Sequence, residues 1–113
     1  MNRLTDMTFL NSFTGGNPDK MKKYISMFLS NCPGQLQLMK ESLEKGDYSA
    51  LRGTAHALKP QITYMGIKKA EDLVKEIEHK AGSNSDVETL PGVLDQFNSV
   101  CLSAMEELKL EIA

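Results

Sequence analysis

Tryptophan is absent from this 113-residue sequence, and aromatic residues make up only 6% of it. The sequence has seven methionines and an apolar fraction of 41%, so a core must be built from Leu, Ile, Val and Met rather than from large rings. A chain of this length buries roughly two thirds of its unfolded surface. We therefore expect residues 1–113 to form a single domain around one core.

An excess of positive charge is also missing, since the formal net charge is −2. This balance creates no general field that would attract nucleic acid or an anionic membrane surface. The sequence contains no run of 18 apolar residues and no signal-peptide pattern at Met1, so we expect a cytoplasmic protein without membrane insertion. The only cysteines, Cys32 and Cys101, lack metal-binding spacing, and we expect two reduced, buried thiols.

Motifs of nucleotide and metal chemistry are missing as well. There is no P-loop and no Gly-x-Gly-x-x-Gly, so the domain should not phosphorylate itself from ATP. One Glu-x-x-His, from Glu76 to His79, falls short of the two that a di-iron bundle needs, and we expect no metal site. We interpret His79 as a histidine near the negative end of a helix. A metal–carboxylate bundle is an alternative that bound metal in the purified protein would revive.

The sequence does contain helical periodicity. No segment alternates with period two, whereas apolar residues recur at spacings of three and four along most of the chain. Asn17 followed by Pro18 is typical of a helix start, and Gly66 and Gly82 are typical of helix ends. Short connections favour antiparallel neighbours. The predicted fold class is all-α, an up-down antiparallel four-helix bundle with a short N-terminal helical cap.

The predicted segments have the following bounds: a short helical piece over 5–12, a helix over 17–31, a further helical stretch to 45 with an inward stripe that includes Leu38, helices over 47–65 and 67–81, and a long last helix to about 108. Cys32-Pro33-Gly34 predicts an interruption between the helix over 17–31 and the stretch that follows it, but it need not stop the helical course of the chain, because proline is tolerated in the first turn of a new helix. Ser85 to Glu88 has the spacing of a capping box. Pro91 predicts a kink, or a short helix ahead of the long one.

One histidine stands apart within the helix predicted over 47–65. The buried stripe of that helix consists of Leu51, Ala55, Leu58, Ile62 and Met65. At about 100° per residue, His56 projects roughly 140° away from the centre of this stripe. Gly53 and Pro60 leave the flanks of its ring open, while Arg52 and Lys59 share its side of the helix. An exposed imidazole beside two cations is a candidate nucleophile that could accept a phosphoryl group, with the cations offsetting the added charge.

The stretch Ala55-His56-Ala57-Leu58-Lys59, with Gly66 ten residues after the histidine, resembles the signature of histidine phosphotransfer (HPt) domains. The predicted helix starts and junctions also fall where that family has them. The resemblance implies a phosphoryl carrier rather than an autonomous enzyme, with His56 modified at Nε2. It implies exchange with aspartates of response-regulator receiver domains, free or within a hybrid sensor histidine kinase. The Mg²⁺ for this chemistry belongs to the receiver, so we expect no cofactor here, and we expect a monomer.

Pro60 departs from the family pattern, which usually has Gly or another small residue after the lysine. Proline removes the amide that would bond the carbonyl of His56, at a cost of about 3 kcal/mol in a regular helix. Because the apolar stripe resumes at Ile62, we expect a kinked continuation. The alternative is termination at Ala57, which would move Lys59 away from the ring.

Glu78 is a second departure, because some family members place Gln twenty-two residues after the histidine. An acid there would accept a hydrogen bond from the imidazole but oppose a phosphoryl group; alternatively, Glu78 is a solvated helix charge. Our leading hypothesis is phosphoryl relay through His56, with a docking surface that includes part of the 17–31 helix. The alternative is a non-phosphorylated adaptor bundle that binds a receiver or kinase domain.

Overall fold

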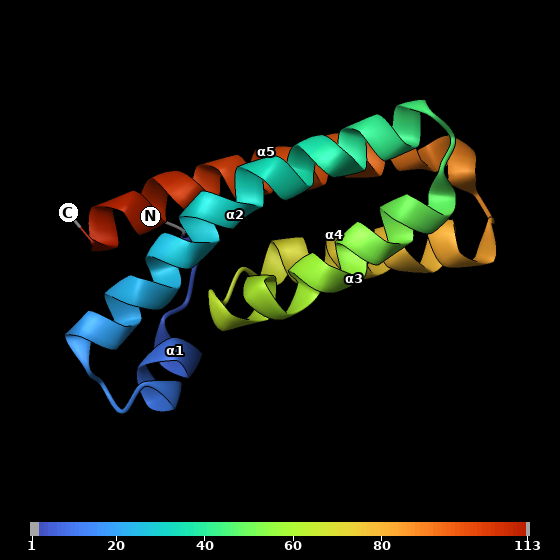
Figure 1. Cartoon of the computed structure of the whole chain (residues 1–113). Helices are drawn as coiled ribbons and strands as arrows, with labels where there is room; N and C mark the ends of the chain where they lie inside the picture. The colour runs from blue at the N-terminus through green and yellow to red at the C-terminus, as the bar shows by residue number, and fades with distance from the viewer. Residues whose placement is uncertain (1–2, 113) are drawn as a thin grey trace.

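The computed structural model describes residues 3–112, which form five α-helices and one short 3-10 helix (Figure 1). Their bounds are α1 Thr8–Phe13, α2 Pro18–Glu44, α3 Tyr48–Tyr64, α4 Lys68–Ser83, η1 Val87–Thr89 and α5 Leu90–Glu111. The four long helices run alternately up and down, and α1 lies beside the beginning of α2 (Figure 1). The predicted all-α four-helix bundle with a short N-terminal helix is confirmed. Within residues 3–112, no helix combines the length and apolarity that a membrane span requires.

Aliphatic side chains and methionine fill most of the interior, as the scarcity of aromatic residues predicts. The largest wholly buried side chains are Phe28, Phe97, Leu10, Met39, Leu51, Leu58, Ile62, Met65, Ile67, Ile77, Leu90 and Leu108. Cys32 and Cys101 are free and buried, as predicted. Leu38 was expected to point inward but is exposed. It lies two residues from the buried Leu36, and positions two apart on a helix face nearly opposite directions.

The interruption predicted at Cys32-Pro33-Gly34 is wrong, but the continued helical course that the prediction allowed is confirmed, because α2 passes through this stretch without a break. Cys32 and Leu36 on either side of Pro33 are both buried. Ending the helix would remove one of these side chains from the core, and this burial outweighs the hydrogen bond that Pro33 lacks. The predicted start of α2 is confirmed, since the Asn17 side chain accepts the backbone N–H of Lys20 at 3.1 Å.

The helix α3 also continues through its proline. It begins after Asp47, whose side chain accepts the N–H of Ala50 at 3.0 Å, and it ends only after Tyr64. The predicted continuation past Pro60 is therefore confirmed, and the alternative of termination at Ala57 is wrong. Leu58 and Ile62 are wholly buried on either side of Pro60, so packing stabilises the helix where the hydrogen bond is missing.

Two expectations about the connection between α4 and α5 are wrong. Gly82 lies inside α4, and the helix ends instead at Asn84, which adopts a left-handed φ of 53°. The capping box predicted from Ser85 to Glu88 does not form: the Ser85 hydroxyl bonds that of Ser83, and the residue before η1 is Asp86, which has a positive φ of 52° and makes no side-chain capping bond. Chain reversal through two left-handed residues replaces the regular cap. The short helix ahead of the long one is confirmed: η1 precedes α5, with Pro91 in the first turn of α5.

Candidate functional site

His56 projects into solvent from the middle of α3, and its side chain is 71% exposed. Its neighbours Ala55 and Leu58 are wholly buried, which fixes the rotation of α3 and turns His56 outward as predicted. The flanks are open: a Cβ added at Gly53 would meet nothing within 4 Å, and Pro60 is exposed. A bulky partner can therefore approach the ring.

A carboxylate from the next helix joins His56 to Lys59. Glu78 of α4 binds His56 Nδ1 through Oε2, and its Oε1 accepts a hydrogen bond from Lys59 Nζ at 2.7 Å. The side chains of Glu78 and Lys59 are only 18% and 31% exposed, so this pair is sheltered while the ring is open. The interpretation of Glu78 as a solvated charge is therefore wrong, and the expected hydrogen bond to the imidazole is confirmed.

The protonation of this triad follows from its partners. The hydrogen bond from Lys59 lowers the pKa of Glu78, and although burial raises it, the bond to His56 adds to the lowering, so the carboxylate is ionised at neutral pH. An ionised carboxylate only accepts hydrogen bonds, so His56 Nδ1 must carry the hydrogen. The lone pair of the neutral ring then lies on Nε2, the nitrogen that Glu78 does not occupy.

A shallow hollow of about 460 Å³ lies beside His56, between α3 and α4. Its walls are formed by Arg52, His56, Lys59, Lys75, Glu78, His79, Gly82 and Ser83. The side chain of Arg52 crosses α4 at Gly82, where an added Cβ would lie 2.9 Å from Arg52 Nε. Sequence reasoning missed Lys75, Gly82 and Ser83; the signal was available, because positions 75, 78, 79 and 82 share one face of α4.

Gly66 does not line this hollow. It turns the chain between α3 and α4 with a φ of 63°, and a Cβ there would overlap the backbone of Asp6. Gly66 is therefore required by the fold at some distance from His56. Among residues 3–112, no group of three or more His, Cys, Asp or Glu could hold a metal ion. Glu76, of the single Glu-x-x-His, instead binds Lys80 at 2.7 Å.

The Hpt domain family model matches residues 23–112. The chain belongs to the Hpt domain family. The match includes the whole of α3 and α4, and with them His56, Lys59 and Glu78, whereas α1 and the residues before it lie outside. The chain is thus an Hpt-domain phosphotransfer protein, and Hpt domains act in two-component phosphorelays.

A solved structure shares this fold. The crystal structure of histidine-containing phosphotransfer protein B (HptB) from Pseudomonas aeruginosa PAO1 is similar with a TM-score of 0.88 and 23% sequence identity. The alignment covers 99% of this chain and 96% of that one, so the likeness includes the N-terminal region. No curated protein sequence gives a significant match.

Proposed function

We propose that His56 accepts a phosphoryl group from a receiver-domain phosphoaspartate and donates it to the aspartate of another receiver. The observation that carries this proposal is the exposed ring whose Nδ1 is occupied by Glu78, so that Nε2 is the nitrogen that remains to react. In the forward step the Nε2 lone pair attacks phosphorus. A P–N bond forms, the P–O bond to the donor aspartate breaks, and its electron pair leaves with the carboxylate on the receiver, which supplies Mg²⁺.

Glu78 supports this step in two ways. It fixes the tautomer in which Nε2 is the nucleophile. Once Nε2 carries the phosphoryl group and Nδ1 keeps its hydrogen, the ring is positively charged, and the Glu78 carboxylate offsets that charge. The same carboxylate repels the phosphoryl oxygens, so the site also needs cations on the phosphoryl side.

Lys59 and Arg52 supply those cations. In the unphosphorylated site, Lys59 Nζ donates a hydrogen bond to Glu78 Oε1 at 2.7 Å. The lysine side chain is flexible, so it can turn toward a phosphoryl group on the ring. Arg52 lines the same hollow one helical turn before His56. The donor and acceptor receivers bind one after the other over the open flanks of His56, and the protein acts as a monomer. A receiver is either a free protein or a domain of a hybrid sensor histidine kinase.

Label transfer from phosphorylated receivers tests the proposal. Receiver domains encoded in the same genome are labelled with ³²P and mixed with the wild type, with His56→Gln and with His79→Gln. His79 is the matched control, because it lines the same hollow. We expect acid-labile label on the wild type and on His79→Gln, and none on His56→Gln. Equal labelling of His56→Gln would contradict the proposal.

The adaptor alternative depends on Pro60, because a helix that ended at this proline would move Lys59 away from the ring of His56. Since α3 continues through Pro60 and Lys59 reaches Glu78, this reason no longer holds. Receivers that bind the protein tightly yet never transfer label would favour the adaptor.

A further inference from the structure

Four aromatic rings gather on the surface where α1, α2 and α3 meet. The chain has four phenylalanines and three tyrosines, and two of each lie here. Tyr64 stacks on Phe9 at 5.4 Å and on Phe13 at 5.8 Å between ring centroids, and Tyr24 meets Phe13 edge-on at 5.5 Å. Phe9 and Phe13 are 46% and 55% exposed. We call Phe9, Phe13, Tyr24 and Tyr64 the aromatic platform. In a protein whose core contains few rings, this exposed apolar surface is unexplained by folding.

The platform lies within reach of a partner bound over His56. Tyr64 follows His56 by eight residues on α3, which is about 12 Å along the helix axis and roughly 80° around it. The exposed Ala57 and Pro60 lie between them on that side. A standard interface buries about 800 Å² per partner, equivalent to a circle of about 16 Å radius. A receiver domain centred on His56 would therefore cover part of the platform.

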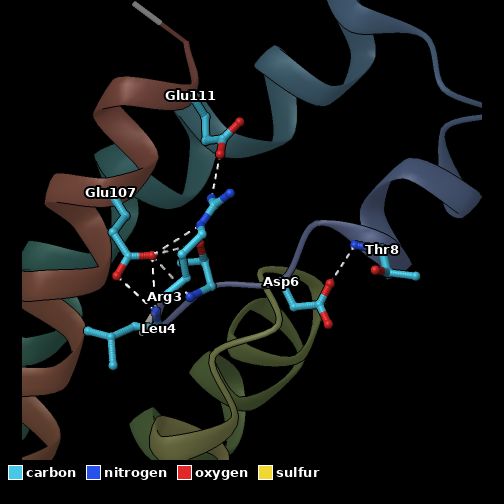
Figure 2. Close-up of polar contacts among 7 residues, drawn as sticks. Arg3, Leu4, Asp6, Thr8, Glu107 and Glu111 are labelled. Carbon is cyan, nitrogen blue, oxygen red and sulfur yellow. Dashed lines mark hydrogen bonds and ion pairs between the residues drawn. The ribbon is translucent and has the colours of Figure 1, made fainter. Parts of the chain in front are cut away.

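The helix α1, which supplies two of the four rings, depends on contacts outside itself to stay in place. It has six residues, too few to be stable alone, and Leu10 is its one wholly buried side chain. The segment before it is fastened to α5. On α5, the Glu107 carboxylate accepts the backbone N–H groups of Leu4 at 2.8 Å and Thr5 at 3.2 Å, and the Thr5 hydroxyl at 3.0 Å (Figure 2).

Further hydrogen bonds carry this attachment on to α1. The next residue, Asp6, donates its backbone N–H to the Met65 carbonyl at 3.2 Å, directly after Tyr64. Its side chain accepts the N–H of Thr8, the first residue of α1, at 2.9 Å (Figure 2). Arg3 adds an ion pair to Glu111. Residues 4–6 and Thr8 are thus all hydrogen-bonded, and they lie outside the part that the family model matches, whereas Glu107 lies inside it.

We propose that Glu107 is a positioning residue for receiver docking: by clamping Leu4 and Thr5 to α5, it holds α1 so that the aromatic platform contacts the receiver bound at His56. This inference rests on the proposed function, because the occupant is the same receiver domain. It assigns the platform to the apolar part of that interface, and it assigns to Glu107 a role exerted through α1 rather than through contact with the receiver.

The test separates docking from chemistry. Phosphorylation by phosphoramidate, a small donor, needs His56 but no docking surface. Transfer from a phosphorylated receiver needs both His56 and the docking surface. The transfer rate is measured over a range of protein concentrations, and receiver binding is measured separately by calorimetry. The variants are Glu107→Ala, Phe9→Ala and the matched control Glu106→Ala, whose glutamate is exposed and accepts a hydrogen bond from Lys109 at 3.0 Å.

We expect Glu107→Ala and Phe9→Ala each to raise KM for the receiver, and to weaken binding, about five- to tenfold. Their kcat and their rate with phosphoramidate should match the wild type, and the double variant should be no worse than about the stronger single variant, since both act through α1. Glu107→Gln, which keeps an acceptor oxygen, should recover part of the loss.

The inference would be overturned if Glu107→Ala bound the receiver with the same affinity, and had the same KM for it, as Glu106→Ala. So would an equal fall in phosphoramidate labelling, which would indicate general damage to the fold. Phe9→Ala alters an exposed ring and should fold normally, so unchanged binding in that variant also counts against the platform. Failure of the proposed function would be seen differently, as a wild type that phosphoramidate does not label on His56, and receiver binding would then still decide the role of the platform.

Discussion

Two glutamates, Glu78 on α4 and Glu107 on α5, have similar surroundings and different partners. Their side chains are 18% and 24% exposed, and hydrogen bonds hold the pKa of each below its ordinary range. Glu78 binds two side chains, the imidazole of His56 and the ammonium of Lys59. Glu107 mainly binds the backbone of Leu4 and Thr5.

This difference separates a chemical role from an architectural one. Side chains can change partners by rotating, so Lys59 can leave Glu78 for a phosphoryl group while the helices stay in place. Backbone donors can change partners only if the chain moves, so the bonds of Glu107 fix the path of residues 3–5. Burial and pKa alone do not distinguish the two roles; the chemical nature of the bonded groups does.

The largest effect that separates the two carboxylates is expected in the rate of phosphorylation by phosphoramidate. Glu78→Ala removes the group that holds Nδ1–H and should slow labelling of His56 roughly 10- to 100-fold, by analogy with the loss of a group that orients a metal-bound histidine. Glu107→Ala should leave this rate unchanged. Glu78→Gln retains an acceptor oxygen and should recover most of the rate; if it is as slow as Glu78→Ala, tautomer control is not the role of Glu78.

The next effect concerns the lifetime of the phosphorylated protein. A charge-assisted hydrogen bond contributes about 1.5–3 kcal/mol, and solvent weakens that of the partly exposed Lys59, so Lys59→Ala should shorten the phosphohistidine lifetime roughly tenfold. Acid-labile label is followed over time. Lys109→Ala, which loses an exposed bond to Glu106 on α5, is the control. Identical decay of both variants would reduce Lys59 to an ordinary surface charge.

Acid should weaken the Glu107 clamp. Burial raises the pKa of Glu107, but the N–H groups of Leu4 and Thr5, the Thr5 hydroxyl and Arg3 outweigh it, so the pKa lies below its ordinary value of 4.5. A carboxyl with a depressed folded-state pKa stabilises the fold fully above its unfolded-state pKa, and this stability is lost as pH falls through the folded-state value. Urea unfolding from pH 7 to pH 3 should therefore show a smaller loss of stability for Glu107→Gln than for the wild type. Parallel curves would contradict this prediction.

The smallest effect is expected at Gly82 and has opposite signs for stability and function. Alanine is preferred to glycine inside a helix by roughly 0.5–1 kcal/mol, so Gly82→Ala should raise the free energy of unfolding. The new Cβ displaces Arg52 from its place across α4, and losing one exposed charge contact should slow transfer roughly two- to fivefold. A variant that is both more stable and equally fast would show that Arg52 does not act at this position.

Local signals were sufficient to predict much of this molecule. The outward direction of His56 followed from periodicity on its own helix, and the starts of α2 and α3 followed from Asn17 and Asp47. These features depend on interactions within one or two turns. Pro33 and Pro60 were harder, because whether a helix survives a proline depends on what its two halves bury in the bundle.

Features that depend on contacts between distant elements were not predictable. The bond from Glu78 to Lys59 requires the rotation of α4 against α3, which the sequence leaves undetermined, and the bond to His56 was expected only from the position of a glutamine in the family. Glu107 gives no signal at all, since it is one of several charges along α5 and its partners are backbone groups more than 100 residues earlier. Asn84 and Asp86 replaced the expected cap by left-handed turns, a conformation that Asn and Asp adopt more readily than other non-glycine residues but that their presence does not require.

Nitrogen NMR of the phosphorylated protein tests the central claim most directly. In ¹⁵N-labelled protein treated with phosphoramidate, long-range ¹H–¹⁵N correlations distinguish the two ring nitrogens of His56. We expect a hydrogen on Nδ1 before the reaction and phosphorus on Nε2 after it. Phosphorus on Nδ1, or on His79 with an unmodified His56, would contradict it.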